Sequence, residues 1–192
     1  VASGTLSFDG SNGQTQVSSI VVNGDGVAEP DETMSLSVPV ATVAPPTPTW
    51  TQLGTDINGE AASDLSGYSV SLSADGTTVA IGASGNDGNG ANSGHVRVYQ
   101  NSGGTWTQLG TDIDGEAASD YSGWSVSLSA DGTTVAIGAM GNGAFSGHVR
   151  VYKNIVGTWT QLGTDIDGEA ASDQSGYSVS LSADGTTVAI GA

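Results

Sequence analysis

The sequence predicts an all-β fold built from repeated four-stranded antiparallel blades of a β-propeller. Three observations lead to this prediction. Val, Thr, Ser and Gly dominate the 192 residues, and Gly alone accounts for 30 of them; these residue types favour strands and turns over helices. Apolar residues alternate with a period of two, as in a strand with one buried face. One segment begins at residue 49 and returns at 105 and 158. Its four short strand patterns in about 55 residues are typical of a propeller blade.

Each repeat contains four strand patterns in the same order. In the first copy the expected strands cover residues 68–73, 77–83, 95–99 and 106–110. The first two are joined by Ala74-Asp75-Gly76, in which glycine supplies the positive φ that a tight hairpin requires. A Gly103-Gly104 turn leads into the fourth strand. The connections are therefore short, and neighbouring strands are expected to pair antiparallel.

The alternation gives each blade one face of large side chains and one of small side chains. In the first copy the large face carries Tyr68, Val70, Leu72, Val79 and Ile81, and the small face carries Ser69, Ser71, Ser73, Ala80 and Gly82. Such sheets can stack on their own copies, large against small, and bury a core that a single repeat could not bury. A β-solenoid would use the same packing, although its coils are normally shorter, so another stacked-sheet form stays an alternative.

The repeats resemble a known family. The run SGYSVSLSADGTTVAIGA, followed by SGHVRVY and TWTQLG, is similar to the FG-GAP repeat of integrin-alpha-like β-propellers in its bacterial form. The resemblance covers 49–192 and implies that SGYSVSLS is the innermost strand of a blade and WTQLG the outermost. On that basis the chain is expected to hold an outer strand at 49–57, two complete blades at about 67–113 and 123–166, and half a blade at 176–192.

The N-terminal segment has a different character. Residues 4–38 resemble the C-terminal half of a Calx-beta domain, an immunoglobulin-like β-sandwich; GTLSF at 4–8, the strand pattern at 16–22 and EPDET at 29–33 carry the resemblance. Its acidic residues Asp25, Glu29, Asp31 and Glu32 resemble a stretch that binds calcium in some of these domains. The expected organisation is a partial Calx-beta-like segment at 1–40, a stiff Pro-rich linker at 41–48 and propeller repeats at 49–192.

The charge of the chain excludes several classes of partner. Three Lys and Arg residues stand against 20 Asp and Glu residues, giving a formal net charge of −17. Nucleic-acid binding needs a cationic surface, and so does docking to anionic membranes. No apolar run is long enough to insert in a bilayer. Because cysteine is absent, packing or bound cations must do the stabilising work that disulfides do in many extracellular proteins.

The segments between blades predict calcium sites. Each places oxygen-bearing side chains at the first, third, fifth and ninth positions, with a glycine that allows a sharp turn, and calcium takes six to eight such oxygens. The candidate ligands are Asp56, Asn58, Glu60, Asp64, Asp112, Asp114, Glu116, Asp120, Asp165, Asp167, Glu169 and Asp173. The alternative is that these residues form Asx-turns that shape the crossover between blades. The Gly/Asn-rich segment 85–92 has one carboxylate, Asp87, and favours a plain loop.

The histidines and tryptophans recur with the repeat. His95 and His148 each precede Val-Arg-Val-Tyr, and we expect an exposed strand face that pairs with acidic neighbours. The tryptophans are Trp50, Trp106, Trp124 and Trp159. Their periodicity favours packing, while a sugar-binding platform is the alternative.

The sequence contains no pattern of catalytic residues: its histidines are repeat equivalents and phosphate-binding glycine motifs are absent. We therefore expect a non-enzymatic extracellular or cell-surface module for adhesion or assembly. Its expected partners are copies of itself or further repeats of a longer chain. The alternatives are a propeller that binds glycans or proteins, and an accessory domain of a larger secreted protein.

Overall fold

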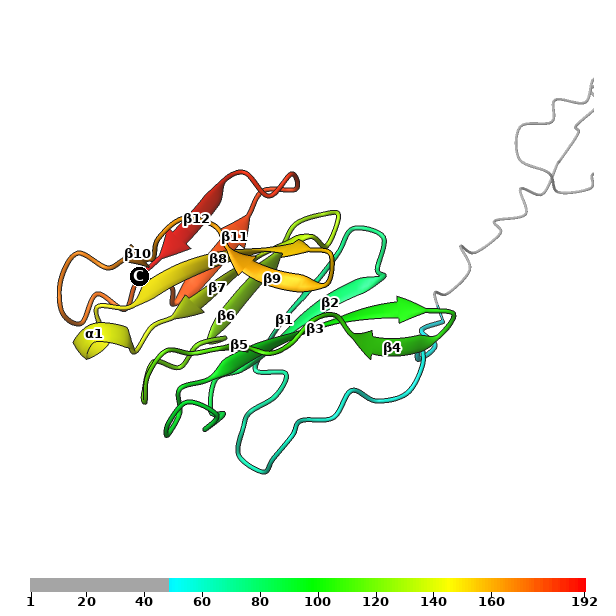
Figure 1. Cartoon of the computed structure of the whole chain (residues 1–192), viewed down its shortest axis with the longest axis horizontal. Helices are drawn as coiled ribbons and strands as arrows, with labels where there is room; N and C mark the ends of the chain where they lie inside the picture. The colour runs from blue at the N-terminus through cyan, green and yellow to red at the C-terminus, as the bar shows by residue number, and fades with distance from the viewer. Residues whose placement is uncertain (1–48) are drawn as a thin grey trace, which may run out of the picture. The chain divides into compact units, whose positions relative to one another are not determined.

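Three successive antiparallel sheets, one for each repeat, make up residues 49–192, the part of the chain that the computed structural model describes (Figure 1). The Calx-beta interpretation, its acidic residues and the linker at 41–48 lie outside the described residues. Within residues 49–192 the all-β prediction is confirmed: the one segment assigned as helix is the four-residue turn α1 (Asn142–Phe145). No helix in this part of the chain is long and apolar enough to cross a membrane.

The first sheet has the strand order expected of a blade. It consists of β1 (Ser69–Leu72), β2 (Thr78–Ala83), β3 (His95–Ser102) and β4 (Thr105–Gln108), hydrogen-bonded in that order. In this register Val70 lies opposite Ile81, and Ala80 lies opposite Val98. The two-residue strand β5 (Ile113–Asp114) pairs with the start of β3.

The second sheet repeats this arrangement and the third has half of it. The second consists of β6 (Ser125–Leu128), β7 (Thr134–Ala139), β8 (His148–Ile155), β9 (Thr158–Gln161) and β10 (Ile166–Asp167). The third consists of β11 (Ser178–Leu181) and β12 (Val188–Gly191). Two four-stranded blades and half of a third, as the sequence predicts, are therefore present in residues 49–192.

Two features of the strands differ from the prediction. Residues 49–57 form no strand, because the described part of the chain has no third strand of an earlier blade with which they could pair. In addition, β5 and β10 lie within the segments expected to be calcium-binding loops. Ile113 explains the first of these strands: its buried side chain belongs to the core cluster, which holds this segment against β3.

The hairpin turns between the first two strands form as predicted. In the first copy the Asp75 carboxylate accepts hydrogen bonds from the Ser73 hydroxyl at 2.7 Å and the Thr77 amide at 3.0 Å. Gly76 has a φ of 72°, which a side-chain-bearing residue rarely adopts. Asp131 and Asp184 repeat these contacts in the other two copies. These acids therefore shape the hairpins.

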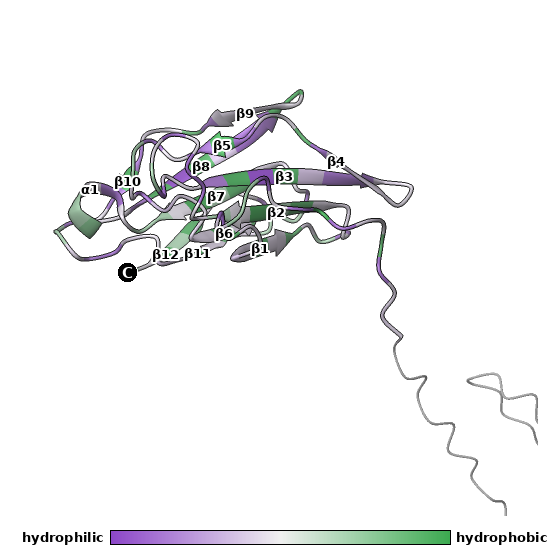
Figure 2. Ribbon diagram, turned by 90° about the horizontal axis from the view of Figure 1, so that it is seen from below, coloured by the Kyte–Doolittle hydropathy of each residue, from purple (hydrophilic) through white to green (hydrophobic). Residues whose placement is uncertain are grey.

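The blades pack large face against small face, as the sequence predicts. Ala80 on the small face of the first blade joins a core with Val126 and Leu128 from the large face of the second. The Ser71 hydroxyl accepts a hydrogen bond from the Leu128 amide at 2.9 Å, and the Ser69 hydroxyl donates to the Gly123 carbonyl at 2.7 Å. In Figure 2 hydrophobic and hydrophilic colours alternate along the strands, with a green stretch in β2. Small residues thus let the backbone of the second blade approach closely enough to bond with the serine hydroxyls of the first.

Candidate functional site

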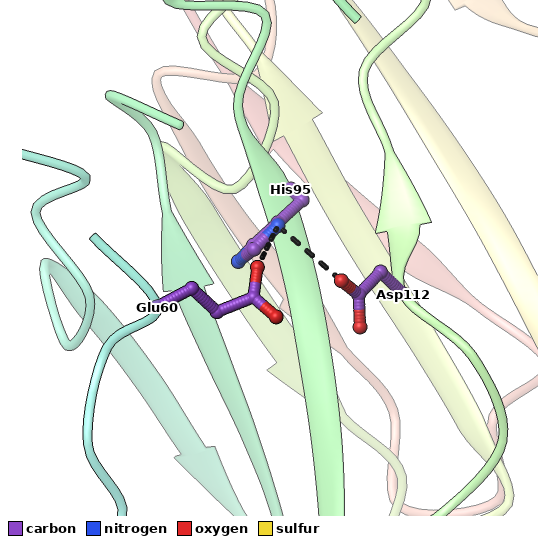
Figure 3. Close-up of side chains that lie close together, drawn as sticks. All are labelled: Glu60, His95 and Asp112. Carbon is purple, nitrogen blue, oxygen red and sulfur yellow. Dashed lines mark ion pairs between the residues drawn. The ribbon is translucent and has the colours of Figure 1, made fainter. Parts of the chain in front are cut away.

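A buried histidine and two carboxylates from three separate segments meet beside the first blade. Figure 3 shows Glu60, His95 and Asp112 with their polar atoms turned toward one another. His95 Nδ1 lies 3.9 Å from Glu60 Oε2 and 3.8 Å from Asp112 Oδ2. One ligand atom from each residue lies within 4.8 Å of the others. His95 is 1% exposed, whereas Glu60 is exposed and Asp112 is half-buried. The cluster therefore has a buried imidazole at its base and carboxylates toward solvent.

The order of the strands explains why these residues meet. His95 is the first residue of β3, and the segment that precedes β1 lies close to this end of the strand. That earlier segment supplies Glu60. The next segment follows β4 and pairs with β3 through β5, so that Asp114 lies opposite His95 and Asp112 comes close to its ring. Three regions far apart in the sequence thus converge on one end of β3.

Arg97, two residues along β3, holds the Glu60 segment in place. Its Nη2 donates a hydrogen bond of 2.9 Å to the carbonyl oxygen of Asn58, and its Nη1 lies 3.5 Å from Glu60 Oε1. The guanidinium carbon also lies 5.7 Å from the centre of the Tyr99 ring, within cation–π range. The two oxygens of Glu60 therefore face different partners, Arg97 on one side and His95 on the other.

The second blade has the same cluster, formed by Glu116, His148 and Asp165. His148 Nδ1 lies 3.8 Å from Asp165 Oδ2, and Arg150 Nη1 lies 3.5 Å from Glu116 Oε1. Burial and the nearby Arg150 lower the pKa of His148 from its usual value of 6.5, while the surrounding carboxylates oppose this shift. The imidazole is therefore neutral at pH 7. A neutral imidazole beside two carboxylates has a nitrogen lone pair to offer to a cation.

The remaining predicted calcium ligands have other neighbours. Asp64 is buried and accepts hydrogen bonds from the Ala61 amide at 3.2 Å and the Asn86 side chain at 3.0 Å. Asp120 and Asp173 bond the equivalent amides three residues earlier. These contacts are turn-forming, as the Asx-turn alternative expects.

The first oxygen-bearing position of each segment has a further recurring contact. Asp56, Asp112 and Asp165 each accept a bond from the glutamine four residues earlier. At the third position, Asn58 and Asp114 contact arginine through their main-chain carbonyls rather than through their side chains. Asp167 lies exposed in β10, and Glu169 is exposed.

Within residues 49–192 no predicted calcium segment brings three of its own carboxylates together; the groups that converge combine residues of successive segments with a histidine. Calcium binding at these segments stays a prediction.

The expectation of an exposed His–Arg strand face is wrong. His95 and Arg97 are buried, as are His148 and Arg150, because the segments carrying Glu60 and Glu116 cover this part of each blade. The expected pairing with acidic neighbours is present. The sequence contains a signal for the cluster that its analysis did not use: His95 and His148 each precede their aspartate partner by 17 residues, whereas the loop that varies in length lies before the histidine.

The four tryptophans have three different surroundings. Trp50 is 95% exposed, so the packing expectation is wrong for this residue. Trp106 and Trp159 donate from their indole nitrogens to the carbonyl oxygens of Leu53 and Leu109, at 2.9 and 2.7 Å. These bonds join successive repeats, as the packing interpretation expects. Trp124 instead lies between two tyrosines at the starts of the inner strands. Its ring centre is 4.6 Å from that of Tyr68 and 5.8 Å from that of Tyr177. This row is partly exposed.

Comparisons with known proteins match part of the chain to a family. Residues 58–99 match the FG-GAP repeat, which agrees with the resemblance found in the sequence. No curated protein matches the chain. Among solved structures, the crystal structure of TolB from Acinetobacter baumannii is similar, with 19% identity and a TM-score of 0.36. The match covers 63% of this chain, and the chain spans only 25% of the TolB chain.

Proposed function

We propose that residues 49–192 form a non-enzymatic propeller module that assembles by stacking further blades of the same repeat on its open faces. One observation carries the proposal. Val70 and Leu72, on the large face of the first blade, are 63% and 57% exposed, whereas the equivalent Val126 and Leu128 of the second blade are 9% and 7% exposed. Equivalent residues of the inner strand are thus uncovered in the first blade and covered in the second.

The contact between the first two blades supports the choice of occupant. The second blade's apolar face is covered by Ser69, Ser71, Ala80 and Gly82 of the first. On the third sheet the corresponding small residues Ser180 and Ala189 are exposed. The chain therefore presents an uncovered large face on one sheet and an uncovered small face on another, which suits head-to-tail stacking. The occupant we propose is the small face of another FG-GAP-like repeat, from a second copy or a longer chain.

The charge sets a condition on this assembly. Copies that each carry a net charge of −17 repel one another, and added salt screens that repulsion. Association should therefore strengthen as ionic strength rises. Calcium bound by the segments between blades would have the same effect, because it neutralises carboxylates. We include calcium stabilisation and an extracellular or cell-surface location in the proposal, on the basis of the acidic segments and the FG-GAP match at 58–99.

The test is the mass of the 192-residue chain in solution, measured by light scattering from micromolar to hundreds of micromolar protein. We expect oligomers whose proportion rises with protein and salt concentration. Leu72→Asp should abolish them. Val156→Asp adds the same charge at a fully exposed residue of the β8–β9 turn and should leave them unchanged. A wild-type chain that stays monomeric throughout, or equal effects of the two variants, would contradict the proposal.

The row Tyr68–Trp124–Tyr177 supports a second candidate, glycan binding. Partly exposed aromatic rings in a row can stack on the apolar faces of sugar rings. Trp106 and Trp159 are less suited to this function, because their indole nitrogens already donate to backbone carbonyls. A glycan array with the wild-type chain and Trp124→Ala distinguishes the candidates: binding that this variant loses supports the second, and an array without binding rejects it.

A further inference from the structure

We propose that Glu60, His95 and Asp112 form a binding site for a divalent transition-metal ion of the zinc class, and that Glu116, His148 and Asp165 form a second. The proposal concerns a different combination of ligands and a different ion from the calcium expected within each acidic segment: each site takes one of the calcium candidates from each of two successive segments and adds a histidine. It also stands independently of blade stacking, since each site lies within the described residues of one chain.

The donor set defines the class of ion. Calcium and magnesium prefer all-oxygen ligands, whereas an imidazole nitrogen with carboxylate oxygens suits zinc and its neighbours in the first transition series. Three protein ligands are common in zinc sites that keep a fourth position for water. One nitrogen and two oxygens converge here, each from a different segment of the chain.

The buried histidines are the feature that points to a bound ion. His95 and His148 are each 1% exposed, and their Nδ1 atoms lie 3.8–3.9 Å from the facing carboxylate oxygens. These distances are too long for hydrogen bonds. An ion about 2.0–2.2 Å from each ligand would bridge the gap after a small inward movement of the carboxylates. Glu60 and Asp112 have exposed surface that allows such movement.

Residues around the proposed ligands hold them in position. Arg97 contacts Glu60 through Oε1, which leaves Oε2, the oxygen that faces His95, for the ion. Gln108 donates to Asp112 Oδ1 at 2.6 Å and leaves Oδ2, the oxygen that faces His95. Outer partners of this kind fix the orientation of metal ligands. A hollow lined by Gln108, Asp112 and Asp114 lies next to one of the three ligands, Asp112.

The second cluster repeats these contacts. Gln161 donates to Asp165 Oδ1 at 2.7 Å, and Arg150 faces Glu116 Oε1. The third segment provides an internal comparison: Glu169 stands in the same local sequence, Asp-Gly-Glu-Ala, as Glu116, yet it belongs to neither group of converging ligands. Each proposed ion would join a segment before a blade, the third strand of that blade and the segment after it, and would tie successive repeats together.

Isothermal titration of the metal-free 192-residue chain with zinc chloride tests the proposal. We expect two zinc ions per chain, and no comparable binding at these sites when calcium chloride replaces zinc. Glu60→Gln combined with Glu116→Gln should weaken both sites at least about tenfold. Glu169→Gln is the matched control, an exposed glutamate in the same sequence context, and should leave the affinity and the stoichiometry unchanged. Failure of the wild type to bind zinc, or equal effects of the control and the double variant, would overturn the proposal.

Nitrogen NMR of the histidine side chains provides a readout on folded wild-type protein. Zinc should shift the Nδ1 resonances of both His95 and His148, and calcium should not. Zinc binding without a shift at either Nδ1 would also overturn the proposal. Blade stacking is read from molecular mass and zinc binding from these resonances, so each proposal can fail without the other.

Discussion

The first strands of the first two blades, β1 and β6, have the same sequence, Ser-Val-Ser-Leu. Each pairs with the second strand of its own blade, but their surroundings differ. In β6 the apolar pair Val126 and Leu128 is buried beneath the small face of the first blade. In β1 the equivalent pair Val70 and Leu72 is exposed. The strand forms in both places, so pairing with the second strand is sufficient to define it. Burial of its large side chains requires another repeat.

The same comparison applies to the other face. Ser71 and Ser127 each accept a hydrogen bond from the backbone amide of a leucine in the next repeat. Ser180 occupies the equivalent position on the third sheet and is exposed. Each repeat therefore carries both halves of an interface, and one interface forms wherever two repeats meet. Local sequence determines the strands, whereas the stability gained from burying apolar side chains comes from the contact between repeats.

The largest expected difference follows from truncating equivalent leucines. Leu128→Ala should lower the free energy of unfolding by about 2–5 kcal/mol, because it opens a cavity between blades. Leu72→Ala should cost no more than about 0.5 kcal/mol in dilute protein, because the side chain is exposed. Urea denaturation of both variants measures the difference. Equal losses would show that β1 is covered in solution even in dilute protein.

Glycine positions give a second and smaller contrast. A Cβ at Gly138 would collide with the Gly176 carbonyl oxygen of the next repeat as well as the Ser125 hydroxyl. At Gly191 the closest atom is the hydroxyl of Ser178, a movable side chain, and no backbone of another repeat is near. Gly138→Ala should therefore destabilise the protein by about 1–3 kcal/mol, and Gly191→Ala by less. Thermal unfolding of the pair checks this order, and equal losses of stability would show that the contact with the next repeat does not matter.

The inter-repeat serines give a smaller effect. Ser127→Ala removes the acceptor of the Leu181 amide, whose bond to the Ser127 hydroxyl is 2.9 Å long. The expected cost is about 1 kcal/mol, the usual net value of such a bond. Ser180→Ala, on the exposed small face, should be within about 0.5 kcal/mol of the wild type. Equal denaturation midpoints for the two variants would show that the hydrogen bond to Ser127 does not stabilise the protein.

The hairpin turns should show no contrast between repeats. Hydrogen bonds from the preceding serine and the following threonine lower the pKa of Asp75, Asp131 and Asp184 from the ordinary value of 3.8. Because the folded pKa lies below the unfolded one, these carboxylates stabilise the fold above pH 3.8. That contribution is lost as the pH falls through the folded pKa. Carboxyl NMR titration should give three pKa values below 3.8, and an ordinary value for any of the three would contradict the turn contacts.

Much of the fold can be predicted from single repeats. The alternation of Val and Leu with Ser predicts the inner strands, and Ala-Asp-Gly predicts the hairpins, because both depend on local geometry. The large and small faces predict the stacking, and Ala80 against Leu128 confirms it. The exception is residues 49–57, where a good strand sequence forms no strand because pairing needs a partner.

The candidate site is harder to predict from the sequence, because it depends on contacts between distant segments. The regular oxygen spacing from Asp112 to Asp120 indicates one cation loop, yet Ile113 is drawn into the core and holds this segment against β3 as β5. Asp120 is thereby left to bond the Ala117 amide, and Asp112 is turned toward His95. The sequence determines the strands, the turns and the two faces of each blade by itself, since neighbouring residues decide them. Only the tertiary structure brings Glu60, His95 and Asp112 together, since their meeting depends on how one repeat lies against the next.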